Sequence, residues 1–532
     1  MKIKSIRNGF ANNSSSAHSI VFLGNHKAKS ESDGSDYGWD YFTLADEESK
    51  KKYLLMTLLH NNFVDFIPHT ALTEKVGWIN PFDSEQVYSK YDLTRTEFEK
   101  SKYGARVEYG AEIIKKIEVD YLIEEYKDIF SKEFIENNMK EGGYIDHQSV
   151  IYLPKNTNGT INNKFAKELF SVLINKNFAI LGGNDNGGDN HPKKEYSTSS
   201  EDESIKAALK VLDFMYSNVI CVYDEENDDF ILQTTDNGNK IRVSFNSDLK
   251  TTKSSIPELI DLKITDNCSY GCTFCYQSST KEGKHANFEN IKKAILMLSN
   301  SRTMEIAIGG GEPTTHPDLL AILKEIKTRN MLACFTTKNF KLHERPDFEE
   351  ILKTANSIAF SCNSVSEIQN VDEIMDAARN IGLYPGSRDC AQFYIQMIPE
   401  LMSDKMFSES LEFINQEMYD TPVTLLGYKD FGFGEKYKPK NRFKTSEWID
   451  NIKYHSKENS IKFGIDSVLV SKWEKELIEK GVDPMALVGS EGKFSCYLDA
   501  VTMKVHKSSF SKEPGIQLTG EENDIKKEFA TF

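Results

Sequence analysis

The sequence predicts an α/β fold: a partial barrel of six consecutive strand–helix units, preceded by an α+β domain and followed by a short C-terminal extension. Three observations lead to this prediction. From residue 257 onward, short apolar strands alternate with amphipathic helices, which is typical of a parallel sheet. Before residue 250 this alternation is absent, and a polar stretch at 246–255 separates the two regions. At 532 residues, the chain is also too long for one compact domain.

Residues 1–250 are expected to form the α+β domain. The stretch Asn12–Ser16 is rich in Ser and Asn and lies between two apolar segments, so we interpret it as a loop between two strands. Apolar residues at helical spacing predict helices at 110–137, 163–175 and 201–216. A β-rich segment with turn residues predicts a β-meander at 218–246.

The partial barrel is expected to occupy residues 257–440, and the extension residues 441–532. The strands of the barrel are predicted at 257–265, 304–309, 331–337, 357–361, 392–398 and 422–427, with helices that include 288–299 and 317–328. The extension is predicted to hold helices at 445–457 and 471–480, a β-hairpin at 492–509 and a poorly ordered tail from 511.

The composition limits the class of protein. Hydrophobic residues make up 39% of the chain and charged residues 27%, which is ordinary for a protein with a buried core. No run approaches eighteen apolar residues, so neither a membrane span nor a secretory signal is expected. The net charge of −16 argues against broad binding to a nucleic-acid backbone. Of the eight cysteines only three cluster, so we expect no disulfide framework and a location in the reducing cytoplasm.

Three cysteines on one short loop are the strongest chemical signal. Cys268, Cys272 and Cys275 follow the first predicted barrel strand with the spacing C-x3-C-x2-C. Three thiolates this close can hold three irons of a cubane cluster and leave the fourth iron open to a small ligand. The alternative is a zinc knuckle with Cys334 or a histidine as fourth ligand. Zinc sites usually pair two C-x2-C halves, and the sequence has no second half.

A second motif follows about 35 residues later, where the next strand ends in Gly309-Gly310-Gly311-Glu312-Pro313. With an aromatic residue, Phe274, just before the last cysteine, residues 257–435 resemble the radical S-adenosylmethionine (radical SAM) superfamily. The resemblance implies a partial (β/α)6 barrel and one [4Fe–4S] cluster per chain, held by the three cysteines. It implies that S-adenosylmethionine (SAM) is reductively cleaved there, giving a 5′-deoxyadenosyl radical that abstracts hydrogen from a substrate.

The resemblance also assigns the cofactor-binding residues. It places Phe274 near the adenine and gives Gly310, Gly311 and Glu312 to the methionine part of SAM, with Glu312 neutralising the ammonium. The fourth barrel strand ends in Ser361-Cys362-Asn363, where many peptide-modifying members have Ser-x-Asp. Asn keeps a hydrogen-bond acceptor for the ribose but loses the charge.

A capped helix start is the alternative interpretation of Ser361-Cys362-Asn363. Gln396, on the fifth strand, is expected to meet the ribose if its side chain points to the barrel interior. Thr337-Lys338-Asn339 departs from the Thr-Asn-Gly that the family has at this strand end.

The substrate is expected to be a peptide or protein. The turn GGGEPTTHP and the C-terminal hairpin resemble peptide-modifying members with a SPASM/twitch extension. The second cysteine of that extension is missing, so a degenerate scaffold without an auxiliary cluster is expected. The first 250 residues are then expected to form a domain that docks the peptide. A further hypothesis is that Asn12–Ser16 is a leader-like segment fused to its own enzyme. An electron donor such as a flavodoxin or ferredoxin is implied. The alternatives are a radical SAM enzyme acting on a small metabolite or RNA, and a non-catalytic iron–sulfur sensor.

Overall fold

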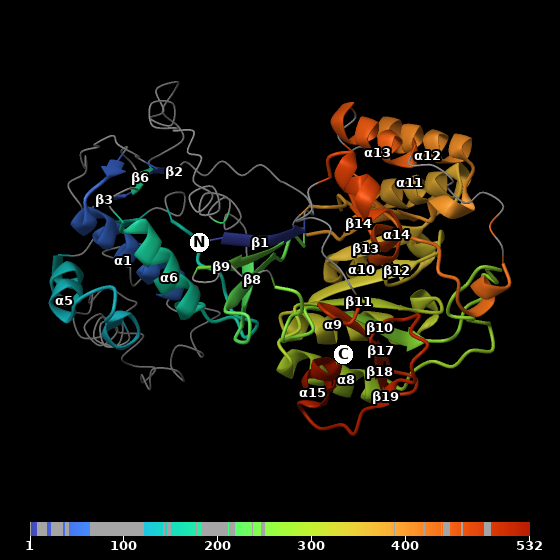
Figure 1. Cartoon of the computed structure of the whole chain (residues 1–532), viewed down its shortest axis with the longest axis horizontal. Coiled ribbons are helices and arrows are strands. Elements are labelled where there is room, and N and C mark those ends of the chain that lie inside the picture. Colours follow the sequence, from blue (N-terminus) through green and yellow to red (C-terminus); the bar gives the residue numbers. More distant parts are fainter. Residues whose placement is uncertain are drawn as a thin grey trace. The chain divides into compact units, whose positions relative to one another are not determined.

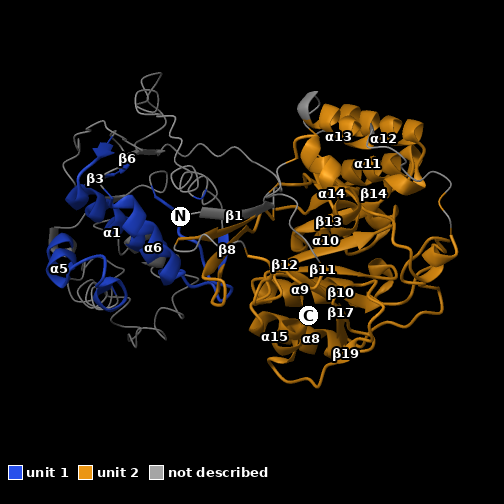
Figure 2. Cartoon of the chain, viewed as in Figure 1, with its two compact units in different colours: residues 1–2, 12–221 blue, residues 3–11, 222–532 orange. Residues whose placement is uncertain are grey.

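The computed structural model describes residues 2–7, 19–22, 36–37, 42–63, 122–141, 144–145, 150–175, 178–182, 211, 219–236, 238–245, 251–387, 389–418, 421–437, 439, 447–458, 461–482 and 491–532. The chain divides into two compact units, one with residues 1–2 and 12–221 and one with residues 3–11 and 222–532 (Figure 2). The second unit begins at Val222, ahead of the boundary expected near 250. Among the described residues, no helix has the length and apolar character needed to cross a membrane.

The first unit combines short strands with helices (Figure 1). One sheet has the order β2-β6-β4 and a second pairs β3 with β5. The strands are β2 (Ser19–Phe22), β3 (Asp36–Tyr37), β4 (Phe42–Leu44), β5 (Tyr144–Ile145) and β6 (Phe178–Gly182), and the helices are α1 (Glu47–Phe63), α5 (Lys132–Glu141) and α6 (Asn163–Leu173). The helix expected at 163–175 is confirmed as α6, and Asn162 caps it by accepting the Phe165 amide.

The expected continuous helix at 110–137 is wrong where the structure describes it. Residues 122–126 are helical, a turn follows, and α5 begins at Lys132. The Ser131 hydroxyl accepts the Phe134 amide at 3.1 Å, so Ser131 caps a new helix and interrupts the predicted one. The helix expected at 201–216 and the Asn12–Ser16 stretch lie outside the described residues, apart from helical Val211.

A four-stranded sheet with the order β1-β9-β8-β7 contains the predicted meander, which is confirmed. Its strands are β1 (Lys2–Arg7), β7 (Val219–Asp224), β8 (Asp229–Thr234) and β9 (Lys240–Ser244). Arg242 on β9 is 2% exposed, and its guanidinium pairs with the carboxylates of Asp224, Asp229 and Glu258. Glu258 directly precedes the first strand of the large sheet. This buried network fixes the meander to the start of that sheet.

The large sheet of the second unit has ten strands in the order β16-β15-β14-β13-β12-β11-β10-β17-β18-β19. The strands from β16 to β17 run parallel, and β18 and β19 are antiparallel to their neighbours. The six predicted strands are β10 (Leu259–Thr265), β11 (Glu305–Gly310), β12 (Leu332–Thr337), β13 (Ser357–Ser361), β14 (Gln392–Met397) and β15 (Val423–Leu425). The predicted α/β class with a parallel sheet is confirmed. The curvature of a partial barrel stays a prediction.

Helices connect the parallel strands and bury their apolar stripes. They are α8 (Phe288–Asn300), α9 (Leu319–Thr328), α10 (Phe348–Thr354), α11 (Val365–Asn380), α12 (Asp404–Glu417), α13 (Glu447–Glu458) and α14 (Ser467–Glu479). On α8 the buried residues include Ile291, Ala294, Ile295 and Leu298, at the predicted helical spacing. On β14 the buried residues alternate with less buried ones, so one face of the sheet packs on helices and the other is more open.

The C-terminal segment extends the sheet on both sides. Before α14, β16 (Phe463–Ile465) adds to β15, a strand that the sequence did not predict. The predicted hairpin is confirmed as β17 (Ser495–Asp499) and β18 (Lys504–His506), and β17 pairs in parallel with β10. The tail expected to be poorly ordered instead forms β19 (Ile516–Gln517) and α15 (Asp524–Thr531). Ile525 and Phe529 of α15 are fully buried, and this apolar pair at helical spacing holds the tail in place.

Candidate functional site

The cysteine loop follows β10 at the carboxyl end of the strand. Its ends are held together, because the Asp266 amide donates to the Lys284 carbonyl at 2.8 Å and the Cys268 amide to the Thr280 carbonyl at 2.9 Å. Lys263 at the end of β10 pairs with Asp266 on the loop and with Asp499 on β17, the latter at 3.2 Å. The loop is therefore anchored to the sheet on two sides.

All three cysteines of the loop carry free, partly exposed thiols. The pKa of Cys268 is raised by burial and also by the nearby Glu312, Cys272 and Cys275. The pKa of Cys272 is likewise raised by burial, while Lys338 lowers it. Negative charge on Glu312 or on one thiol thus disfavours ionisation of the neighbouring thiols. Within the described residues, no group of three or more His, Cys, Asp and Glu side chains is gathered as a site for a metal ion.

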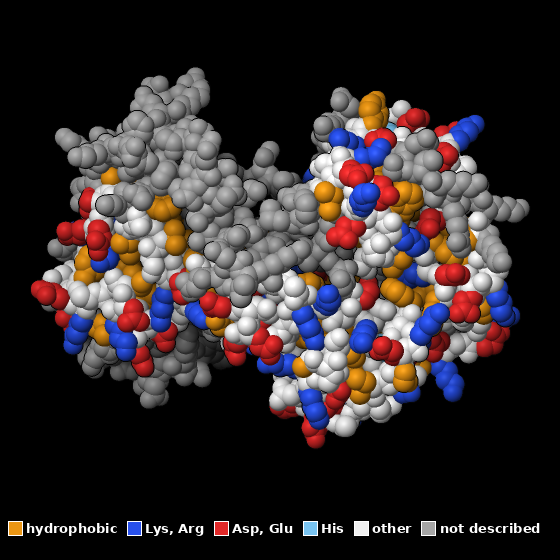
Figure 3. Space-filling model, in the orientation of Figure 1, with side chains coloured by type: hydrophobic (Ala, Val, Ile, Leu, Met, Phe, Trp, Pro, Cys, Tyr) orange, Lys and Arg blue, Asp and Glu red, His pale blue; other side chains and the backbone are white. Residues whose placement is uncertain are grey.

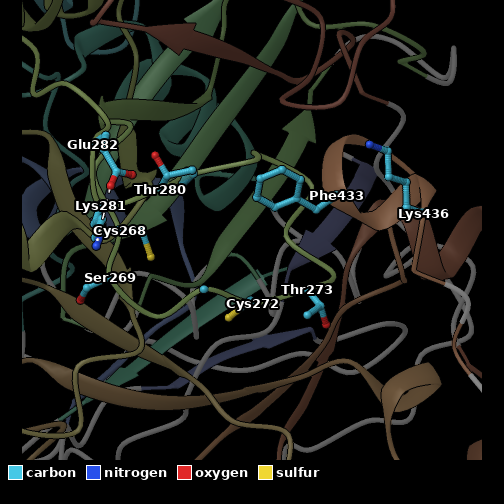
Figure 4. Close-up of a pocket in the computed structure, with 11 residues that line it drawn as sticks. Cys268, Ser269, Cys272, Thr273, Thr280, Lys281, Glu282, Phe433 and Lys436 are labelled. Carbon is cyan, nitrogen blue, oxygen red and sulfur yellow. Dashed lines mark ion pairs between the residues drawn. The ribbon is translucent and has the colours of Figure 1, made fainter.

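A cavity of about 500 Å³ opens beside this loop, and the Cys268 and Cys272 side chains line it. Figure 4 shows the sulfurs of Cys268 and Cys272 on the cysteine loop. Phe433 and Lys436, which also line the cavity, come from a segment much later in the chain. Acidic and basic side chains are interspersed over the visible face of the second unit (Figure 3).

The glycine turn packs directly against the start of the cysteine loop. Gly310 has a φ of +122°, and a Cβ there would lie 2.3 Å from the Thr265 carbonyl oxygen. At Gly311 a Cβ would lie 2.2 Å from the Asn267 carbonyl oxygen. The Gly311 amide donates to Thr265 at 2.7 Å, and the Glu312 amide to Asn267 at 2.8 Å. These two positions need glycine because the turn and the cysteine loop touch through their backbones, whereas a Cβ at Gly309 would meet no atom within 4 Å.

The Glu312 carboxylate is 3% exposed and is organised by its neighbours. Its Oε1 accepts the Thr314 amide at 3.0 Å and the hydroxyls of Thr314 and Thr337, both at 2.7 Å. Its Oε2 accepts the Lys338 amide at 2.9 Å. Each carboxylate oxygen has about two acceptor sites, and Oε2 accepts one donor from the described residues, so it keeps capacity for one more. Sequence reasoning gave Thr337 and Lys338 no defined role, and their position at the end of β12 was the available signal.

The segment 428–437 lies over the cysteine loop and was missed by sequence reasoning. The Phe433 amide donates to the Cys275 carbonyl at 3.0 Å. A Cβ at Gly432 would lie 2.3 Å from the Tyr276 carbonyl oxygen, so this close approach requires glycine. The ring of Phe274 meets the Tyr437 ring edge-on at 5.9 Å. The signal in the sequence is the run Phe-Gly-Phe-Gly at 431–434, glycines alternating with aromatics at a strand end.

The remaining predicted residues lie at neighbouring strand ends. Ser361 ends β13 and pairs in register with Gln396 on β14. The Asn363 Oδ1 accepts the Ile398 amide at 3.2 Å, so this oxygen ties two strand ends together. Ser364, next in the chain, caps α11, in line with the alternative interpretation of a capped helix start. Gln396 and Tyr394 line a second cavity on the open face of the sheet.

Comparison with known proteins identifies the central part of the chain. The sequence model of the Radical SAM superfamily matches residues 262–382, which hold the cysteine loop and the glycine turn. Residues 262–382 form a radical SAM domain. A putative glycyl-radical enzyme activating enzyme of Methanocaldococcus jannaschii is 22% identical over 176 residues, 31% of this chain and 66% of that protein. A GTP 3′,8-cyclase of Mannheimia succiniciproducens is 27% identical over 115 residues, 20% of this chain and 34% of that protein.

The chain thus spans about two thirds of the length of the first relative and about a third of the second. It carries the domain of a radical SAM enzyme. Solved structures with some likeness include Streptococcus suis SuiB bound to its precursor peptide SuiA, with a TM-score of 0.45, 11% identity, and coverage of 58% of this chain and 87% of that one. Another is anSMEcpe with bound AdoMet, with a TM-score of 0.37, 12% identity, and coverage of 51% and 80%.

Proposed function

We propose that this chain is a radical SAM enzyme that acts on a peptide or protein. The observation that carries the proposal is the packing of two motifs into one site. The loop with three free thiols and the turn with a buried carboxylate are joined by the hydrogen bonds from Gly311 to Thr265 and from Glu312 to Asn267. Both motifs lie in the radical SAM domain.

In this proposal, Cys268, Cys272 and Cys275 hold one [4Fe–4S] cluster per chain. The donor chemistry fits, because three thiols on one loop leave a fourth iron for another ligand. When bound, the cluster and SAM together supply a 5′-deoxyadenosyl radical that takes a hydrogen atom from the substrate. The protein's own contribution is to hold and cover the loop. Phe433, at 39% exposure, and the glycines beside it bring segment 428–437 over the cysteine loop.

Glu312 is proposed to bind the ammonium of SAM through its Oε2. The three donors on Oε1 fix the carboxylate in place, and the Lys338 amide leaves Oε2 room for a further donor. The glycines at 310 and 311 serve this site by keeping the turn against the cysteine loop. Ser361, Asn363 and Gln396 are proposed near the ribose, and Phe274 near the adenine.

A peptide is favoured as substrate by the resemblance of the turn GGGEPTTHP to peptide-modifying members and by the C-terminal hairpin beside β10. The proposal includes the finer points of the sequence prediction: a partial barrel in 257–440, docking by the first 250 residues, a degenerate SPASM/twitch-like extension, a flavodoxin or ferredoxin as electron donor, and a cytoplasmic location. The relative named GTP 3′,8-cyclase makes a nucleotide the second candidate substrate.

Iron content and SAM cleavage test the proposal. Anaerobically reconstituted protein is expected to hold about four irons and four sulfides per chain, and to form 5′-deoxyadenosine slowly with dithionite and SAM. Cys272→Ala should lose the cluster, whereas Cys496→Ala, a buried cysteine on β17, should keep it. About eight irons, or a cluster that survives Cys272→Ala, would contradict the assignment.

A second experiment separates SAM binding from cluster binding. Glu312→Ala should weaken SAM binding at least about tenfold, since a buried charge-assisted hydrogen bond is lost, and should leave the cluster absorbance intact. Glu312→Gln keeps the shape of the side chain and serves as the milder variant. Unchanged SAM affinity in Glu312→Ala would disprove the role of this carboxylate.

A further inference from the structure

The second cavity, of about 500 Å³, lies on the open face of the large sheet. Alternate residues of the strands form its wall: on β14, Gln392, Tyr394 and Gln396 line it, while the residues between them are buried against helices. Gln396 and, on β12, Thr336 lie one residue before the carboxyl ends of their strands. Because parallel strands end at one edge of a sheet, the cavity extends toward the edge that carries the cysteine loop.

The amino end of this cavity is bordered by the β8–β9 turn, through Thr235, Asp236 and Gly238. All of these residues belong to the second unit. Gln233, just before the turn, is fully buried, and its amide nitrogen donates to Glu305 Oε2 at 2.8 Å. Its Oε1 meets no hydrogen-bond donor among the described residues. Gln233 is not among the residues that line the cavity, so its amide holds the Glu305 carboxylate from within the protein.

The charged side chains that line the cavity are all acidic. They are Asp236, Glu305 and Asp466, and no Lys or Arg is among the described residues that line it. Glu305 stands at the start of β11, and Asp466 directly follows β16 on the opposite part of the sheet. The remaining polar lining is neutral, with amides, hydroxyls and one phenol: Thr235, Thr336, Asn356, Ser357, Gln392, Tyr394, Gln396 and Thr424.

Neighbouring groups respond to this negative charge. Asp261 lies on β10, two residues beyond the lining residue Leu259, and its pKa is raised to about 6 by burial and by Glu491, Glu305 and Asp466, against the opposing effect of Lys429. Burial alone would lower the pKa of Lys429, yet Tyr276, Asp466 and Asp261 raise it. The surroundings of Asp261 and Lys429 therefore favour a positive charge over a negative one.

We propose that this cavity receives a cationic group of the substrate, a primary amine or a guanidinium, which in a peptide is a Lys or Arg side chain. This inference rests on the proposed function and names its substrate class. Glu305 and Asp466 supply the charge, and the neutral amides and hydroxyls of the lining supply acceptors for the several N–H donors of such a group. The same lining repels a nucleotide triphosphate, which sets the peptide ahead of the second candidate substrate.

The test uses the full-length reconstituted protein with SAM and four acetylated, amidated tripeptides, Gly-X-Gly, with X as Lys, Arg, Gln or Glu. Binding is measured by calorimetry, and 5′-deoxyadenosine formation is followed in parallel. The Lys or the Arg peptide should bind at least about tenfold more tightly than the Gln peptide, and the Glu peptide most weakly. The order of Lys and Arg tells an amine site from a guanidinium site.

Two variants test whether the tighter binding of the cationic peptide depends on the cavity. Glu305→Gln removes the charge and keeps the shape, so it should reduce the preference for the cationic peptide to about twofold or less. Glu350→Gln, at an exposed position on α10, is the matched control and should leave the preference unchanged. Normal cluster absorbance in both variants shows that they fold. Equal binding of the Lys, Arg and Gln peptides, or a preference that survives Glu305→Gln, overturns the inference. Absence of 5′-deoxyadenosine in the unmodified protein instead overturns the proposed function, since peptide binding is measured separately.

Discussion

Replacing Asp261 by Asn should stabilise the protein at neutral pH and leave it nearly unchanged in acid. Burial on the open face of β10, with Glu491, Glu305 and Asp466 nearby, raises the pKa of this carboxyl from 3.8 to about 6. The folded state thus binds the proton more tightly than the unfolded state. The carboxyl costs stability once the pH exceeds about 4, and the full cost is present above pH 6.

The magnitude follows from the pKa difference. At 1.36 kcal/mol for each pH unit between 3.8 and about 6, ionised Asp261 costs the folded state about 3 kcal/mol at pH 7.5 and less than about 1 kcal/mol at pH 4. Asn has nearly the same shape and cannot ionise, so it removes this cost. Lys429 loses one of the acids around it, which offsets part of the gain.

Urea unfolding at pH 4 and pH 7.5, followed by circular dichroism on protein without added iron, measures the effect. The free energy of unfolding of Asp261→Asn should exceed that of the unmodified protein at pH 7.5 by up to about 3 kcal/mol, with the difference largely gone at pH 4. The control Asp376→Asn, on an exposed position of α11, should change stability by less than about 0.5 kcal/mol at either pH. A stability gain that is the same at both pH values, or a loss at pH 7.5, would refute the reasoning.

Two further predictions concern the backbone and the buried charges. Gly310→Ala should disrupt the packing of the turn on the cysteine loop, because its φ is +122° and its Cβ would overlap the Thr265 carbonyl, and the iron content after reconstitution should fall well below that of the unmodified protein. Gly309→Ala, with open space around its Cβ, should keep the iron, and equal iron content in the two variants would disprove the packing argument. Arg242→Met should lower the free energy of unfolding by about 3–5 kcal/mol, since three buried carboxylates lose their shared cation. Arg379→Met, at a half-buried position on α11, is its control, and a comparable loss there would show that the cost does not come from full burial.

Local patterns were sufficient to predict the strands and helices of the second unit. Strands such as β11 and β14 alternate apolar and less apolar residues, and helices such as α8 repeat apolar residues at helical spacing, so these elements were visible in a short window. By contrast, β16 has only three residues, with its glycine exposed, and such a strand forms only because β15 offers a partner. The helical tail was missed for a similar reason, since two buried residues hold an otherwise polar segment.

The two motifs of the site could be predicted from the sequence, whereas the residues that hold and cover these motifs could not. Cysteine spacing and the glycine turn were visible because one short segment carries each motif. The donors on Glu312 come from the end of β12, and the cover of the loop comes from 428–437, more than 150 residues after Cys275. Such contacts depend on the order of strands in the sheet, which a single sequence does not specify. The charge network of Arg242 was invisible for the same reason, because its partners lie on three different segments.

The strand lengths at the two margins of the large sheet bear on how this protein behaves in concentrated solution. Within the described part of the chain, the long central strands are flanked on both sides, and the sheet ends in β16 with three residues and in β19 with two. A terminal strand with unpaired amides and carbonyls is the usual starting point for intermolecular strand pairing and fibre growth. Strands this short expose only a few such groups, too few to align a second chain. The wide sheet that carries the cysteine loop is thereby guarded against self-association at both of its margins.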